Sequence, residues 1–125
     1  MIVALNELLA AQPVLNKMRT LPFRGRQAFL LAKMIKAIGE EISGFDESRN
    51  NILIKYCDKD DNGEAIVNEG QVHIKDDVLA ECNAEIQELL TTEINLPFAA
   101  LPIDWFDEVD LSANDMAALM PLIEE

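Results

Sequence analysis

The chain has few of the side chains from which metal centres and nucleophilic active sites are built. Its 125 residues include one histidine, His73, and two cysteines, Cys57 and Cys82, which lie far apart and have no second cysteine at metal-ligand spacing. The sequence also has no glycine-rich phosphate-binding loop and no His-Glu-x-x-His motif. Nothing near His73 supplies a nucleophile and an orienting acid in order. We therefore predict a protein that is not an enzyme and that uses no cofactor.

Long apolar runs are missing as well. No run approaches the roughly 20 residues that a transmembrane helix needs, and the first residues lack the basic flank of a signal peptide. Half of the residues are hydrophobic, which disfavours disorder and suits one domain with a real core. The cysteines fit buried thiols in a reducing compartment, although one disulfide stays open as an alternative. We expect a single domain, residues 1–125, in the cytoplasm and not in a membrane.

Positive charge is absent from the last fifty residues. All ten Lys and Arg lie in residues 1–75, whereas thirteen of the 23 Asp and Glu lie in residues 76–125, and the net charge is −13. This polarity makes direct nucleic-acid binding by the acidic end unlikely on electrostatic grounds. It fits head-to-tail contacts between copies, and it equally fits an intramolecular pairing of a basic helix with an acidic one.

Two helices are expected in the first half. Residues 6–19 carry an apolar stripe interrupted by Pro13, so the helix either kinks or restarts there. A longer helix from about residue 23 to residue 57 follows, because its apolar residues recur at steps of three and four. Arg49 is the charged member of that stripe, and its stem is expected to pack while its head reaches water. Residues 1–57 are therefore predicted to form a helical hairpin.

The second half mixes helix with extended chain. Residues 58–75 are predicted to form a turn and a small β-hairpin, residues 76–92 a helix opened by Asp76 and Asp77, and residues 93–125 an extended segment with a capped C-terminal helix. The cap is predicted from Ser112, which is followed three residues later by Asp115. The expected fold class is α+β and predominantly helical.

One segment satisfies the EF-hand calcium-loop pattern. Oxygen-bearing side chains occupy its alternate positions, glycine occupies position six, and glutamate occupies position twelve; the five candidate ligands are Asp58, Asp60, Asn62, Glu64 and Glu69. The residues that follow, however, alternate like a strand, whereas a true EF-hand continues into a helix. We predict a turn followed by a hairpin and no metal site, and we keep a calcium-binding module as a second alternative.

The segment from residue 103 to residue 111 is the best candidate for binding a partner. The only adjacent aromatic residues of the chain stand there among carboxylates, and such an anchor could insert into a basic, apolar groove of another protein. In the alternative interpretation, one aromatic ring closes the core and the acids face solvent. The candidate partner-binding residues are Asp104, Trp105, Phe106, Asp107, Glu108 and Asp110.

The order of these elements resembles a family of small acidic bacteriophage and prophage proteins of uncharacterised function. The resemblance rests on Leu21-Pro22 after the first helix, Asp61-Asn62-Gly63 after the long one, and a closing helix at Leu111-Ser112. It implies a non-enzymatic phage protein made in the host cytoplasm that acts through a phage or host protein in assembly or as an accessory factor, and association with the virion is left open. The alternative is an acidic inhibitor of a host nucleic-acid-binding or defence protein. A homo-oligomer is also open.

Overall fold

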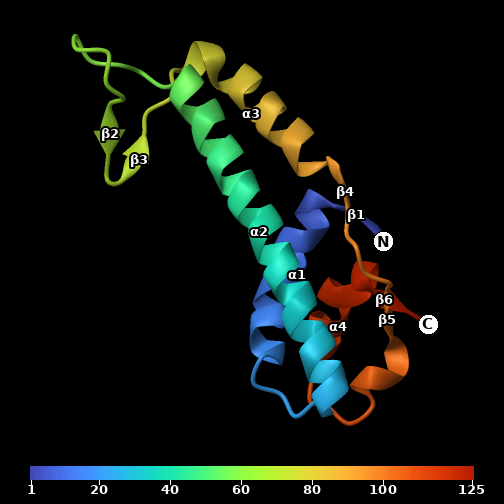
Figure 1. Cartoon of the computed structure of the whole chain (residues 1–125). Coiled ribbons are helices and arrows are strands. Elements are labelled where there is room, and N and C mark those ends of the chain that lie inside the picture. The colour runs from blue at the N-terminus through green and yellow to red at the C-terminus, as the bar shows by residue number, and fades with distance from the viewer. The chain divides into compact units, whose positions relative to one another are not determined.

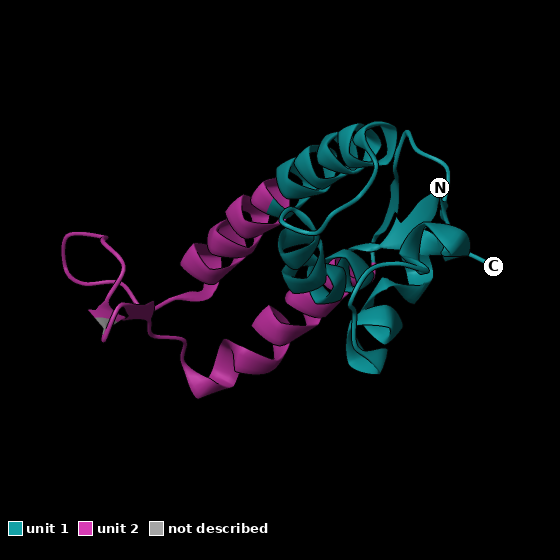
Figure 2. Cartoon of the chain, turned by 90° about the horizontal axis from the view of Figure 1, so that it is seen from below, with its two compact units in different colours: residues 1–42, 92–125 teal, residues 43–91 magenta. Residues whose placement is uncertain are grey.

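The computed structural model describes residues 1–67 and 69–125. The chain divides into two compact units, residues 1–42 together with 92–125, and residues 43–91 (Figure 2). The predicted fold class, α+β and mostly helical, is confirmed. The boundary between the units falls inside the long helix.

Helices dominate the described chain (Figure 1). The α-helices are α1 (Leu5–Met18), α2 (Gly25–Tyr56), α3 (Asp76–Leu90) and α4 (Ala113–Leu119), with two short 3-10 helices, η1 (Ile103–Phe106) and η2 (Met120–Leu122). The strands are β1 (Ile2–Ala4), β2 (Val67–Asn68), β3 (Gln71–Val72), β4 (Glu93–Asn95), β5 (Leu101–Pro102) and β6 (Ile123–Glu124). Although α2 has 32 residues, no helix in the described ranges is both long enough and apolar enough to cross a membrane.

The first unit, residues 1–42 and 92–125, surrounds a dense apolar core. Leu8 of α1, Ile38 of α2 and Leu119 of α4 are at most 1 % exposed. The helix α1 runs through Pro13 without a break and packs against α4. The sequence predicted the apolar face of α2 correctly, since Leu31 and Ile35 are buried as well.

Two pairs of short strands complete the first unit. The antiparallel pair β1–β4 places Val3 opposite Ile94, and the parallel pair β5–β6 places Leu101 opposite Ile123. The sequence did not predict β1 and β6, because strands of two or three residues have too few positions to show alternation. The pairs hold segment 93–102 along the core and so position the residues that follow it.

The predicted cap of the C-terminal helix is confirmed. The Ser112 hydroxyl accepts a hydrogen bond from the Asp115 backbone N–H at 3.1 Å, and the Asp115 carboxylate accepts one from the Ser112 backbone N–H at 3.2 Å. The same carboxylate accepts a hydrogen bond from Lys17 at 2.7 Å, which links α1 to α4. Lys17 is the main cause that lowers the pKa of Asp115, followed by the Ser112 backbone.

The second unit, residues 43–91, has few buried side chains: Phe45, Cys57 and Cys82. The last turn of α2 contacts α3 through polar groups, because Lys55 and the Tyr56 hydroxyl each donate a hydrogen bond to Glu85 at 2.9 Å. These bonds raise the pKa of Lys55 and of Tyr56 and lower the pKa of Glu85. Cys57 and Cys82 are free thiols.

The predicted β-hairpin is present in the second unit. Between β2 and β3, Glu69 has a φ of 52° and Gly70 a φ of 79°, and positive φ at both central residues is typical of a tight hairpin turn. Gly63 also has a positive φ, 80°, in the turn predicted at Asn62-Gly63. Arg49 is exposed, as expected for an arginine whose head reaches water.

Candidate functional site

The two adjacent aromatic residues of segment 103–111 have different environments. Phe106, at the end of η1, is 7 % exposed and packs edge-to-face on Phe23, with ring centroids 6.1 Å apart. Trp105 is half-buried and reaches the surface. Phe106 therefore packs in the core, as the second interpretation expected. Trp105 lies at the surface, where a partner could reach its ring.

Trp105 lines two hollows of the first unit. The first is named here the acidic hollow and has a volume of about 360 Å³. It lies between the start of α2 and the η1 segment, and its charged and aromatic lining consists of Phe23, Arg24, Asp104, Trp105, Asp107 and Glu108. Three of the candidate carboxylates thus lie around one concave surface. The fourth, Asp110, is exposed and lies outside the lining.

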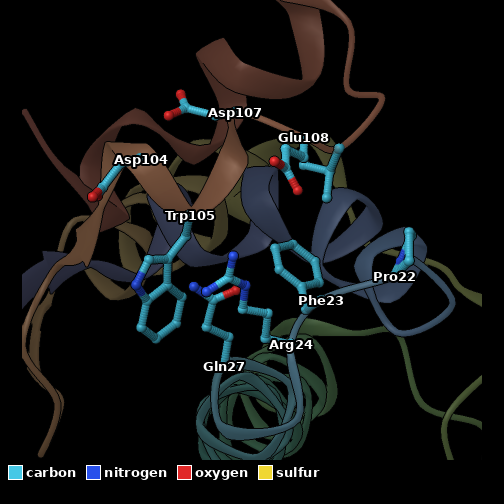
Figure 3. A pocket seen from close by; sticks show the side chains of 9 residues that line it. Pro22, Phe23, Arg24, Gln27, Asp104, Trp105, Asp107 and Glu108 are labelled. Carbon is cyan, nitrogen blue, oxygen red and sulfur yellow. The ribbon is translucent and has the colours of Figure 1, made fainter.

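Arg24 brings a positive charge into the acidic hollow. Figure 3 shows its side chain between the rings of Trp105 and Phe23, with the Glu108 carboxylate turned toward the same space. The carboxylates of Asp104 and Asp107 point away from Arg24 in the same view. Within the part of the chain that the structure describes, none of these four charged groups forms an ion pair. Their charges therefore stay available to a partner.

The second hollow that Trp105 lines is named the apolar groove. It has a volume of about 500 Å³ and lies between α2 and segment 97–102. Met34 and Leu101 are 2 % and 4 % exposed and belong to the core beneath it, whereas Leu30 is 40 % exposed. Lys33 also lines the groove, and its ammonium lies 5.6 Å from the centroid of the Phe29 ring. The groove is open and mostly apolar.

The sequence identified only one wall of this surface. It pointed to the carboxylates and the aromatic pair, but it did not point to Arg24, Leu30 or the Pro97–Leu101 segment, which tertiary folding brings beside them. An unusual proline spacing at Pro97 and Pro102 was a weak signal of an extended wall. The surface is therefore composite, and its parts are far apart in the chain.

The calcium-pattern loop has a different geometry from an EF-hand. Asp58 contacts His73 through its carboxylate and lies 3.6 Å from the Lys75 ammonium. The Asp60 carboxylate accepts hydrogen bonds from the backbone N–H groups of Asn62 and Glu64, both at 2.9 Å, as in an Asx turn. Glu69 lies in the hairpin turn and does not start an exiting helix. Across residues 1–67 and 69–125, no three His, Cys, Asp or Glu side chains are placed to hold a metal ion.

The charge polarity of the sequence is only partly neutralised within the chain. Lys17 pairs with Asp115 in the first unit, and Lys55 pairs with Glu85 and Lys75 with Asp58 in the second. In the described residues, the other bases of the first 36 residues form no ion pair: Arg19, Arg24, Arg26, Lys33 and Lys36. Pairing of basic with acidic residues inside the chain was one explanation of the uneven charge distribution. It accounts for few of the basic residues near the N-terminus.

The chain matches no protein-family model, no curated protein and no solved structure. The resemblance to small acidic phage proteins therefore stays a prediction, and the proposals below rest on the geometry of the first unit.

Proposed function

We propose that the protein is non-enzymatic and acts by binding another protein through the surface around Trp105. The observation that carries the proposal is that Trp105 lines two open hollows, the acidic hollow and the apolar groove. Aromatic side chains at the centre of a concave, partly apolar surface are the residues that most often dominate binding energy. The resemblance to phage proteins is the reason to propose a phage or host partner, in virion assembly or as an accessory factor.

Exposed apolar residues extend this surface beyond the hollows. Phe29 is 64 % exposed at the start of α2, and Ile103 is 41 % exposed beside Trp105. Both belong to elements that also line the hollows, and the buried Met34 forms part of the apolar groove. A partner that binds there meets a side chain already held in the core, which lowers the ordering cost of association.

Photo-crosslinking tests the proposal in cells that make the protein. Benzoylphenylalanine in place of Ile103 should crosslink one defined partner, and the same group in place of Ile54, which is 50 % exposed in the second unit, should not. Adding Trp105→Ala should abolish the crosslink from position 103. A crosslink that survives Trp105→Ala, or equal crosslinking from both positions, would overturn the proposed surface.

An acidic inhibitor of a nucleic-acid-binding protein is the second candidate. It is favoured by the exposed carboxylates Asp77 and Glu81 along α3, which could occupy a phosphate-binding surface. Such a contact depends on exposed charges and weakens steeply with salt, whereas a contact centred on Trp105 keeps its apolar part. Crosslinking from positions 77 and 81 in high and low salt separates the two candidates.

A further inference from the structure

We infer that the surface around Trp105 takes a partner segment in which a bulky apolar side chain stands close to a lysine or arginine. This inference rests on the proposed function and adds the chemistry of the partner. The apolar side chain would occupy the apolar groove, and the basic side chain would lie at the rim of the acidic hollow.

The apolar half follows from the lining of the groove. Leu30, Met34 and Trp105 present aliphatic and aromatic groups, and Pro97 and Pro102 lack the backbone N–H groups that would pair with a polar ligand. A volume of about 500 Å³ leaves room for a large side chain and lies within the usual range of ligand pockets, about 300–1,000 Å³. Burial of such a side chain supplies the main attraction.

The basic half follows from the charges that stay unpaired. Asp104 and Asp107 are exposed and point away from Arg24, so a partner's cation can approach them from solvent without displacing it. The Trp105 ring lines the same hollow, and an indole ring attracts cations. The net charge of −13 also opposes a second copy of this chain and favours a basic partner.

The charge of Arg24 makes the effect of its removal on binding depend on the charge of the partner. If the partner is basic, Arg24 is a like charge in the hollow, and its removal should strengthen binding. If the partner instead brought a carboxylate to Arg24, its removal should weaken binding. Arg26 is a matched control, because it is an exposed base in the first turn of α2, two residues after Arg24, and it does not line the hollow.

The test is selection of a random-peptide display library on the immobilised full-length protein, with depletion on the Trp105→Ala variant. We expect enriched peptides to combine a bulky apolar residue with a nearby Lys or Arg. Their affinity should fall about thirty-fold or more in Trp105→Ala, the size of a hot-spot loss. Arg24→Gln should raise the affinity about two- to five-fold, the size of an exposed charge interaction, and Arg26→Gln should leave it unchanged.

The failures of the two proposals are distinguishable. Peptides that depend on Trp105 but lack a basic residue, or that bind more weakly to Arg24→Gln, would overturn this inference and leave the proposed surface in place. A library that yields no peptide dependent on Trp105 would overturn both. Circular dichroism of each variant should match that of the wild type, and the Asp46→Asn variant, altered at an exposed acid of the second unit that lines neither hollow, should bind as the wild type does.

Discussion

Residues 1–42 and 92–125 contain nearly all the buried apolar side chains of the described chain, whereas residues 43–91 contribute Phe45, Cys57 and Cys82. In the second unit, the contact between α2 and α3 includes hydrogen bonds from Lys55 and Tyr56 to Glu85. Exposed polar links of this kind contribute little stability, while buried aliphatic groups contribute much. The comparison indicates that the first unit is the stable scaffold and that the second unit opens at a lower free energy.

The difference matters for function, because the proposed binding surface belongs entirely to the scaffold. Trp105 and both hollows are built from residues of the first unit. A binding surface on a rigid core keeps its shape in the free protein, which lowers the cost of binding.

The largest expected effect is on core leucines. Leu8→Ala should lower the free energy of unfolding by about 3 kcal/mol, because Leu8 is 0 % exposed and its removal leaves a cavity. The matched variant Leu79→Ala in the second unit should cost less than about 1 kcal/mol, since Leu79 is 40 % exposed. Urea unfolding followed by circular dichroism measures both. Equal losses would contradict the contrast between the units.

Thiol labelling measures opening of each unit directly. Burial is the main cause that raises the pKa of the Cys82 thiol, so its reaction should require local opening. The first variant, Cys57→Ala, keeps Cys82 as its single thiol. The second variant lacks both native thiols and carries Val14→Cys in the first unit. Cys82 in the first variant should react at least about ten-fold faster than the cysteine at position 14 in the second. Each rate is taken relative to that of the urea-unfolded chain. Equal protection of both thiols would show that the two units open together.

Much of the architecture could be predicted because its causes are local. The stripe through Leu31, Ile35 and Ile38 predicts α2, and Ser112 with Asp115 predicts the start of α4. The pairing of β1 with β4 could not be predicted, since it joins three-residue strands about ninety positions apart. The carboxylates of the candidate site stand in one segment of the sequence. Arg24 and Leu30 line the same hollows as Trp105 only because the chain folds, and sequence periodicity does not reveal this.

The loop that matches the calcium pattern shows the limit of motifs. Its ligand types agree with an EF-hand, but a motif does not specify the helix that must follow it. In the structure, Asp58 contacts His73, and Asp60 closes its own turn. Asp58 and Asp60 therefore form contacts within the turn and hairpin region.

The next largest effect expected on the free energy of unfolding comes from relief of backbone strain at Glu69 in the second unit. Glu69 has a φ of 52°, a conformation that suits asparagine better than glutamate. Glu69→Asn should raise the free energy of unfolding of residues 43–91 by about 0.5 kcal/mol. Hydrogen exchange of the hairpin amides measures this change. The control Glu64→Asn, at a position without positive φ, should give no gain, and a gain there would contradict the argument from strain.

The smallest expected effect is a change in acid sensitivity. Lys17 lowers the pKa of Asp115, so their interaction contributes fully above the ordinary aspartate pKa of about 4 and is lost as pH falls through the lower pKa of the folded state. Lys17→Gln should therefore reduce stability slightly at neutral pH and not at all at the lowest pH. Thermal unfolding between neutral and acidic pH measures the difference. An effect independent of pH would contradict the role of the ion pair.

The most direct measurement of the central claim uses Trp105, the single tryptophan of the chain, as its own reporter. The full-length protein is titrated to about 1 mM with the most enriched display peptide and with the same peptide carrying Glu in place of each Lys and Arg. The basic peptide should cause a saturable change of Trp105 emission, and its acidic counterpart a much weaker one. Equal affinity for both peptides, or no change in emission with either, would contradict this prediction.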